Sequence, residues 1–467
     1  MTYSTPKQLR FPPVAGLSVR GNFDGGALSS DFGPILLRGI DQQTGLTQRL
    51  AAVFDDQRHA SYIQHDLRDL FAQRIYQVGC AYEDGNDANS LRHDPMFKLG
   101  LDKKPLDEDN DLASAPTLSR FENAAARKDI YRLSQAFVDH FIASYAQPPK
   151  VIVLDMDHSE DATYGQQELS FYNHHYRSYC YLPLFLFEGL SGKFITAALR
   201  PGKRPTGAEN AMIVKRVLKR LRVAWPDTHI VLRGDGHFSN PELMQLAIDD
   251  PLTNFIFGMT GNAVLSKIAS PYLQANVQTH DIRCHNAKMS NAQQPHSTRT
   301  YHDVEYSAKS WPKTFRVILK AEVMSLGENP RFVVTSLEEP TADCIYRDLY
   351  CARGQDENFI KMVKNDLFCD RTSDHSFLAN SMRMLFSCAA YVLHHTLKTE
   401  VLKHTELSQA QPSTIITRLF KIAVRVVQYK DRVKLQLPSH CPVKQLLHTV
   451  TEVLYQSRPP PILNALS

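Results

Sequence analysis

The chain has 467 residues, of which 43% are hydrophobic and 22% are charged, and its formal net charge is +4. This length is too great for one compact core of usual size and the apolar share is that of a folded protein, so we expect two or three domains. No uncharged apolar run reaches the roughly 18 residues of a membrane helix, and the Met1 end has no signal-peptide core, which predicts a soluble intracellular protein. The net charge is too small to establish nucleic-acid binding.

Cysteine usage argues against two further classes of protein. None of the eight cysteines forms a C-x-x-C pair, which argues against a zinc ribbon. Without a secretion signal a disulfide scaffold is not expected either. We expect these cysteines to be reduced and mostly packed.

The first part of the chain, to about residue 100, is predicted to be helical after an irregular start rich in Pro and Gly. Apolar residues recur at helical spacing in 46–54 and in 62–81. An acidic, turn-rich segment at 101–115 is typical of a surface loop or linker. Another helix should begin near Thr117 or Ser119, where Glu122 is placed for a capping box.

Two strand ends in the central part of the chain carry acids. The apolar run that begins at Val151 ends in Asp155 and Asp157, which share a face because side chains alternate along a strand. A second apolar strand at 229–233 opens into a turn in which Asp235 stands between two glycines. Further strands at 179–188, 193–199 and 254–258, with helices at 208–223 and 241–248, predict a mixed sheet.

The pattern then changes to strands, so 262–345 is predicted to be a β-rich insertion. One side of the helix that follows carries a phenol, three cations and one carboxylate: Tyr350, Arg353, Lys361, Lys364 and Glu357. Such a set is unusual for a solvated surface and typical of one that faces phosphates and a metal ion. In isolation it also fits an ordinary amphipathic helix with an Arg353–Glu357 ion pair.

The end of the chain is predicted to hold a long helix at 377–402 and a hairpin formed by 419–428 and 432–437. From Met382 onward Lys and Arg outnumber Asp and Glu. A second group of cations surrounds the single acid Glu209: Arg200, Lys203, Arg204, Lys215, Arg216, Lys219, Arg220 and Arg222. Both groups fit either solvated surfaces or a DNA-backbone footprint.

Three acids from two strands and a helix are suited to metal-dependent phosphodiester chemistry. Hard divalent ions prefer carboxylate oxygens, and two ions roughly 3.5–4 Å apart can activate an oxygen nucleophile and relieve charge on the departing oxygen. We therefore assign Asp157, Asp235 and Glu357 to metal binding. Asp155 is the rival of Asp157, because both side chains point the same way.

The spacing Tyr350-x2-Arg353-x3-Glu357-x6-Lys364, together with Asp157 and Asp235, resembles the Y-R-E-K signature and the catalytic DDE acids of bacterial insertion-sequence transposases of DDE group 1. Other phrases of this group extend the resemblance over nearly the whole chain: Phe23-Asp-Gly-Gly, Leu28-Ser-Ser-Asp31, Tyr82-Glu-Asp-Gly-Asn-Asp87, Leu91-Arg-His-Asp94-Pro, Thr117-Leu-Ser-Arg120-Phe-Glu-Asn123, Gly165-Gln-Gln-Glu168, Tyr179-Cys-Tyr-Leu-Pro183-Leu and Leu199-Arg-Pro-Gly202.

The resemblance implies an α/β fold with a ribonuclease-H-like mixed-sheet core, a β-rich insertion and flanking helical segments. The expected regions are 1–115, mainly helical and either a transposon-end binding region or a plain packing domain; 116–261, the first part of the core; 262–345, the insertion; 346–405, the completion of the core; and 406–467, a basic region for DNA binding or dimerisation.

The resemblance also implies a reaction. Such enzymes bind terminal inverted repeats as a homodimer on double-stranded DNA and catalyse strand cleavage and strand transfer with Mg²⁺ or Mn²⁺, here expected in the cytoplasm close to the nucleoid. Their first acid precedes small hydroxyl residues at a strand end, which favours Asp157 because Ser159 follows. The residues expected to contact DNA are Tyr350, Arg353, Lys361, Lys364, Arg200, Lys203 and Arg204, and Trp311 either stacks on a displaced base or packs in the core.

Two other functions remain open. Asp155-Met-Asp157-His-Ser159 also resembles the strand end of haloacid-dehalogenase-type phosphatases, in which the first Asp is the nucleophile, although Gly234-Asp235 lacks the second acid those enzymes need. The second of these functions is that of a transposase-derived DNA-binding protein without catalytic activity. The presence of all three acids, Asp157, Asp235 and Glu357, disfavours it.

Overall fold

The computed structural model describes residues 8–456, which divide into two compact units. The first unit combines 8–47, 58–121 and 396–456, and the second combines 48–57 with 122–395. Within the described part of the chain, no helix has the length and apolar character to cross a membrane.

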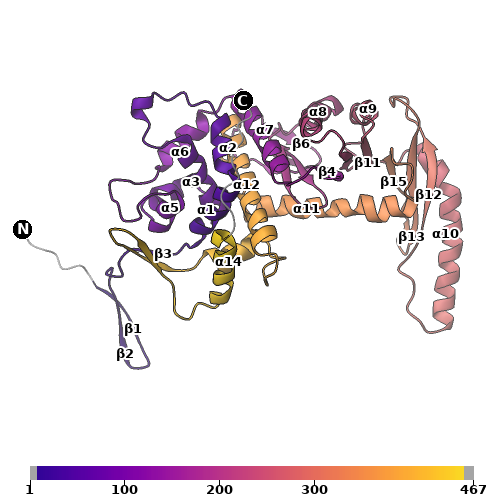
Figure 1. Ribbon diagram of the computed structural model, residues 1–467. Coiled ribbons are helices and arrows are strands. Elements are labelled where there is room, and N and C mark those ends of the chain that lie inside the picture. Colours follow the sequence, from indigo (N-terminus) through magenta and orange to yellow (C-terminus); the bar gives the residue numbers. More distant parts are fainter. Residues whose placement is uncertain (1–7, 457–467) are drawn as a thin grey trace, which may run out of the picture. The chain divides into compact units, whose positions relative to one another are not determined.

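Helices dominate the first unit (Figure 1). They are α1 (Gly33–Thr44), α3 (Leu67–Gly79), α4 (Ala88–Leu91), α5 (Pro95–Gly100), α13 (Pro412–Ile415) and α14 (Lys444–Gln456), with α2 (Leu46–Val53) and α6 (Ala115–Asn123) at the boundaries of the unit. The expected C-terminal hairpin is present as β16 (Val424–Gln428) and β17 (Val433–Gln436), and β3 (Leu28–Ser29) pairs with β16 as a third strand.

Two of the sequence phrases noted above have structural roles in this unit. The buried carboxylate of Asp31 accepts hydrogen bonds from the Tyr82 hydroxyl at 2.6 Å and from Lys421 Nζ at 2.7 Å, so it joins three distant segments of the chain. Asp94 caps α5 by accepting from the backbone N–H of Met96 at 2.8 Å. These acids stabilise the unit.

The start of the chain differs from the irregular segment that was predicted. Strands β1 (Leu9–Val14) and β2 (Leu17–Gly21) form an antiparallel hairpin, with an irregularity between Phe11 and Val14 where Pro12 and Pro13 lie. Proline cannot donate to a strand ladder, but a bulge or an edge accommodates it. Ala15 and Gly16 have φ angles of 49° and 81°, the left-handed pair that a tight two-residue hairpin turn needs.

The second unit is built on a mixed sheet with the strand order β12-β13-β15-β11-β10-β4-β8-β9, in which β14 also pairs with β13. Strands β4, β10 and β11 are parallel, whereas β8, β9, β15, β13 and β12 are added antiparallel to their neighbours. The bounds are β4 (Val151–His158), β8 (Leu184–Glu188), β9 (Phe194–Ala198), β10 (His229–Gly234), β11 (Thr253–Met259), β12 (Ser297–Tyr306), β13 (Phe315–Met324), β14 (Gly327–Glu328) and β15 (Arg331–Thr335). The predicted mixed α/β core is confirmed, and its strand order is consistent with a ribonuclease-H-like fold.

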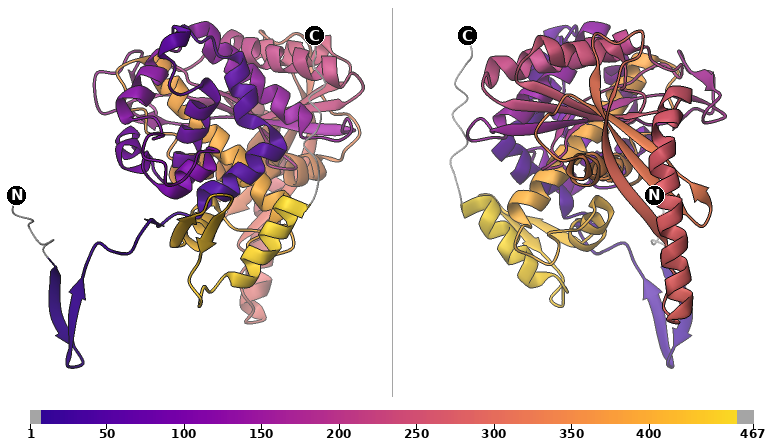
Figure 2. Two further views of the ribbon diagram at one scale, coloured as in Figure 1. Left: turned by 60° about the vertical axis from the view of Figure 1, so that its left-hand side comes forward. Right: turned by 90° about the vertical axis from the view of Figure 1, so that its right-hand side faces the viewer.

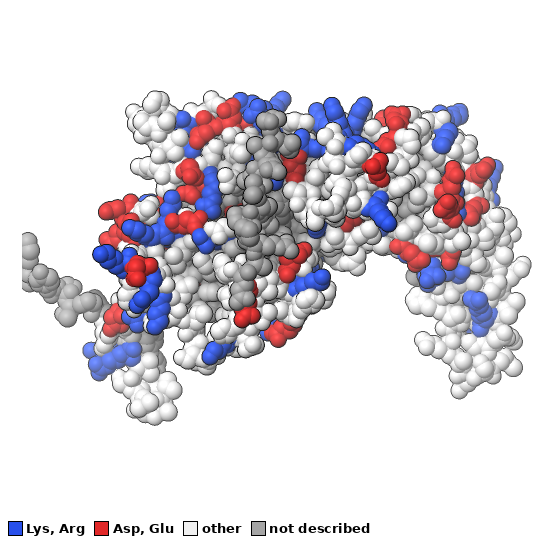
Figure 3. All heavy atoms as spheres, in the orientation of Figure 1, with Lys and Arg blue, Asp and Glu red and all other residues white. Residues whose placement is uncertain are grey.

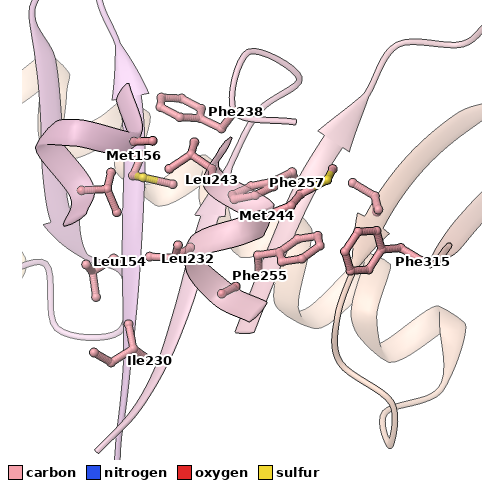
Figure 4. Packing of buried hydrophobic residues seen from close by; sticks show 14 of the residues in the cluster. Leu154, Met156, Ile230, Leu232, Phe238, Leu243, Met244, Phe255, Phe257 and Phe315 are labelled. Carbon is pink, nitrogen blue, oxygen red and sulfur yellow. The ribbon is translucent and has the colours of Figure 1, made fainter. Parts of the chain in front are cut away.

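One face of this sheet packs against helices α7 (Arg127–Ala143), α8 (Gly207–Ala224) and α9 (Pro241–Asp249). Leu154 and Met156 of β4 point into this apolar layer, together with residues from β10, β11 and α9 (Figure 4). Because side chains alternate along a strand, Asp155 and Asp157 point to the opposite face. That face packs against the helical segment that contains α11 (Gly354–Lys361) and against α12 (Phe377–Thr396).

The segment 262–345 was predicted to be rich in strands, and its first part is instead the 27-residue helix α10 (Ala263–Met289). Figure 2 shows α10 lying along β12 and β13, and five of its buried residues, Leu265, Ala269, Leu273, Asn276 and His280, recur at helical spacing. Small and polar residues occupy three of these five positions, which hides the helical pattern in the sequence. The strands of the segment continue the core sheet through the β11–β15 pair. A separate small sheet contains β5 (Asp161–Ala162), β6 (Phe171–Asn173) and β7 (Ser178–Tyr181).

Candidate active site

Two of the candidate acids lie at the carboxyl ends of neighbouring parallel strands. In the β4–β10 register Gly234 is opposite Met156, so Asp157 at the end of β4 and Asp235 directly after β10 are at the same edge of the sheet. Ligand sites of α/β sheets commonly form at this edge. His237 lies beside Asp235, with its Nδ1 atom 3.3 Å from Asp235 Oδ2.

Asp155 has a different role from Asp157. Both of its oxygens are paired with Arg233, each at 2.5 Å, and the Asp155 carboxylate is completely buried. A Cβ at Gly189 would overlap this pair, so the pair is tightly enclosed. Arg233 also donates to the carbonyl oxygen of Leu349 at 2.6 Å, which ties β10 to the helical segment opposite. Asp155 is therefore occupied in holding the fold, and Asp157 is the acid that remains available to a ligand.

The third acid is on a helical segment of uneven pitch. This segment consists of a π-helix (Cys344–Tyr350), a 3-10 turn (Cys351–Arg353), α11, which carries Glu357, and a second π-helix (Met362–Asp366). This segment places Arg353 between two acids: its Nη1 atom is 3.2 Å from Asp157 Oδ2, and its Nη2 atom is 3.5 Å from Glu357 Oε1. The Glu357 side chain is 50% exposed, against 17% for Asp157.

The electrostatics show that these acids act on one another. The pKa of Asp157 is raised to about 6, chiefly by burial; Arg353 acts to lower it, and the nearby charges of Asp235 and Glu357 act to raise it. Burial also acts to raise the pKa of Asp235, but the hydrogen bonds and charge of His237 outweigh it and the net shift is downward. The site therefore concentrates negative charge, which Arg353 and His237 partly offset.

The donor atoms fit a hard divalent cation. All three candidate ligands are carboxylates, which Mg²⁺ and Mn²⁺ prefer, and the pKa of Asp157 is raised by burial and, to a smaller extent, by the charges of Asp235 and Glu357, both of which a bound cation would offset. As the side chains stand, no three metal-ligating groups within residues 8–456 surround a common point. Arg353 lies between two of the acids, so a cation bound there would displace the guanidinium from Asp157.

We expect the affinity for Mn²⁺ to depend on pH with a midpoint near pH 6. Asp157 must lose its proton to act as a ligand, so below its pKa of about 6 the affinity should fall by about tenfold per pH unit, and above it the affinity should level off. Calorimetric titration of Mn²⁺ between pH 5 and pH 8 measures this profile. The Asp157→Asn variant should bind Mn²⁺ weakly, and its affinity should not depend on pH in this range. An Mn²⁺ affinity of the unaltered protein that does not change with pH would contradict the assignment of Asp157 as a ligand.

The two remaining cations of the segment 344–366, Lys361 and Lys364, have different surroundings. Lys364 Nζ donates to Ser159 Oγ at 3.2 Å and also to the carbonyl oxygen of Glu160, so it holds the loop that follows β4. Lys361 is exposed. Thus Arg353 contacts the acids directly, Lys364 supports the strand end that carries Asp157, and Lys361 is open to a ligand.

Tyr350 lines a cavity beside the acids. The cavity has a volume of about 270 Å³ and is lined by Gly236, Gly258, Met259, Thr260, Gly261, Pro330, Arg331, Phe332, Tyr346 and Tyr350. A Cβ at Gly258 would overlap the Tyr350 hydroxyl, whereas a Cβ at Gly236 would find its nearest neighbour, Thr260 Oγ1, at 3.7 Å. Gly258 therefore lets the phenol approach the strand closely.

We expect Gly258→Ala to displace Tyr350 and to slow the DNA cleavage that the resemblance implies by about 100-fold, since misplacement by about 1 Å can have an effect of this size. Gly236→Ala is the matched control, because its methyl group makes an ordinary contact. Cleavage rates of the two variants, together with their melting temperatures, check this. Equal rates for both variants would show that the close approach of Tyr350 has no part in the reaction.

Four other residues were expected to contact DNA. Lys203 and Arg204 are exposed, and Figure 3 shows further cations gathered over α8. Arg200 is an exception, because it is 9% exposed and pairs with Glu209 at 3.1 Å, so it cannot reach a phosphate without breaking this pair. Trp311 packs edge-on against Tyr306 and Phe315 with ring centroids 5.3 and 5.8 Å apart, and is only partly exposed.

Sequence reasoning missed Asp356, which precedes Glu357. Its side chain is completely buried, and neither carboxylate oxygen has a hydrogen-bond partner among the residues that the structure describes. Burial raises its pKa well above the usual range, and the charges of Asp155 and Asp157 add to this effect. The sequence signal was the adjacent pair of acids, of which helical spacing assigns only one to the face with Arg353.

The class of protein is that of the DDE transposases. The family model described as "Transposase DDE domain group 1" matches residues 11–459, and the chain belongs to that family. A comparison with curated proteins finds no match. One similar solved structure is that of the piggyBac transposase in a synaptic complex with hairpin DNA, with 11% identity, a TM-score of 0.44, and coverage of 83% of this chain and 79% of that chain.

Proposed function

We propose that this transposase cleaves and joins DNA at the terminal inverted repeats of an insertion sequence, by a cut-and-paste reaction that depends on Mg²⁺ or Mn²⁺. The observation that carries the proposal is the placement of Asp157 and Glu357 on either side of Arg353, with Asp235 at the same sheet edge as Asp157. Carboxylates arranged in this way suit the binding of divalent ions at a phosphodiester.

Each residue has a role in this proposal. Asp157, Asp235 and Glu357 would hold up to two divalent ions, which supply charge stabilisation on the attacked phosphate and its leaving oxygen. Arg353, released from Asp157, would grip a phosphate at the cut end through its paired N–H groups. Lys361, Lys203 and Arg204 are exposed and would bind backbone phosphates away from the reacting atoms. Two copies of the chain would pair two ends.

The phosphatase alternative is disfavoured by the geometry of its nucleophile. In that reading Asp155 attacks the substrate, but Asp155 is wholly buried and both of its oxygens are paired with Arg233. A substrate phosphate has no access to it. The nick-mapping experiment described next distinguishes a catalytic transposase from a DNA-binding protein without catalytic activity.

The test uses purified protein, Mg²⁺ and a duplex that carries the genomic sequence flanking the coding region. Mapping of nicks at nucleotide resolution should find breaks at the boundaries of an inverted repeat, with free 3′-hydroxyl ends. Retarded DNA without nicks would contradict the catalytic proposal and support a passive binder. Release of phosphate from a small phosphate ester would support the phosphatase instead.

A further inference from the structure

The β1–β2 hairpin has large apolar side chains in solvent. Leu9, Phe11 and Leu17 are 44%, 53% and 72% exposed. Among the strands that the structure describes, β1 and β2 pair only with each other, and a two-stranded hairpin alone in water is marginally stable. A binding partner would therefore stabilise this ribbon.

The ribbon has one polar and one apolar face. Arg10 is directly opposite Arg20, so both guanidinium groups are on the same face. On that face Arg20 Nη1 donates to Gln8 Oε1 at 3.3 Å, and Gln8 Nε2 donates to Asn22 Oδ1 at 3.1 Å. The alternate positions, Leu9 and Phe11, form the apolar face.

The arginine pair lacks compensating charge. Residues 8–23 include no Asp or Glu, and no carboxylate within 8–456 forms an ion pair with Arg10 or Arg20. Like charges directly opposite each other destabilise a strand pair, so this arrangement favours a bound anion. Because the whole chain has a net charge of +4, a polyanion is a better complement than a second copy of the chain.

We propose that the β1–β2 hairpin is a DNA-binding arm, in which Arg10 and Arg20 each bind a backbone phosphate of duplex DNA. A two-stranded ribbon has the size that the major groove admits, and paired arginines would fix its position on the backbone. This proposal rests on the DNA-processing function proposed above. It assigns part of the DNA affinity of the chain to a segment separate from the acids Asp157, Asp235 and Glu357.

The experiment measures the affinity of the full chain for a labelled duplex of flanking genomic DNA by fluorescence anisotropy, at KCl concentrations from 50 to 200 mM. The double variant Arg10→Gln/Arg20→Gln should bind about 10- to 60-fold more weakly at 100 mM KCl, and its slope of log affinity against log salt should be shallower by about 1.8, or 0.9 for each lost phosphate contact. Arg10→Lys/Arg20→Lys keeps the charges and should keep most of the slope. Lys267→Gln/Arg283→Gln removes two exposed cations from α10 and is the matched control.

The outcomes separate this proposal from the function it rests on. Failure of the unaltered chain to bind or cleave any duplex would overturn the proposed function. Cleavage by the unaltered chain, with equal affinity and slope for the Arg10→Gln/Arg20→Gln variant, would overturn the arm alone. A dimer in light scattering that dissociates in Leu9→Ser/Phe11→Ser, with DNA affinity unchanged in the arginine variant, would assign the hairpin to a second copy.

Discussion

Asp157→Asn and Asp235→Asn are each expected to reduce DNA cleavage by about 1,000-fold or more, with DNA binding retained. The reason is that charge stabilisation by a carboxylate-bound metal is worth several kcal/mol, and about 1.4 kcal/mol corresponds to a tenfold change in rate. Each change removes a ligand charge and leaves the side-chain volume almost unaltered. Single-turnover cleavage of an end duplex in Mg²⁺ measures the effect, and gel retardation measures binding.

Asp227→Asn is the control for this experiment, because it makes the same chemical change at an exposed position of the same unit. Its cleavage rate should equal that of the unaltered chain. Glu357→Gln should resemble the two aspartate variants. Cleavage at near-normal rate by Asp157→Asn or Asp235→Asn would remove these acids from the active site.

Asp155→Ala is expected to destabilise the second unit by about 3–5 kcal/mol, because it leaves the Arg233 guanidinium buried without its counter-charge. The double change Asp155→Leu/Arg233→Met should recover much of that loss, since apolar residues of similar volume often replace a buried pair without penalty. Denaturant unfolding, followed by circular dichroism, compares the variants.

The exposed Asp139–Arg220 ion pair provides the contrast. Its side chains are 27% and 43% exposed, so Asp139→Ala should change stability by less than about 1 kcal/mol. If Asp155→Ala were as mild as Asp139→Ala, Asp155 would not hold the fold. It would then be a rival for the metal site again.

Local patterns in the sequence predicted much of the core and the acids. The apolar runs from Val151 and from His229 identified β4 and β10, and with them the strand ends that carry Asp157 and Asp235. What the sequence did not decide was the choice between Asp155 and Asp157. That choice depends on a partner 78 residues away in the chain, Arg233, which the register of two parallel strands places opposite Asp155.

Other features were hidden because their signals are long-range or mixed. The helix α10 buries Asn276 and His280, which bond to the facing strands, so its apolar stripe is interrupted. The predicted strand at 179–188 is divided at Pro183 into β7 and β8, which belong to different sheets. The position of Arg353 between two acids follows from tertiary packing of an uneven helix, and helical spacing alone predicted only its pairing with Glu357.

We propose that Asp157, Asp235 and Glu357 together hold divalent cations. Diffraction from crystals of the protein soaked in Mn²⁺, recorded at a wavelength where manganese scatters anomalously, tests it directly. Manganese should lie about 2.1 Å from oxygens of these carboxylates, with Arg353 moved away from Asp157. Saturating Mn²⁺ that leaves the Arg353–Asp157 pair intact, with no manganese peak among the three acids, would contradict it.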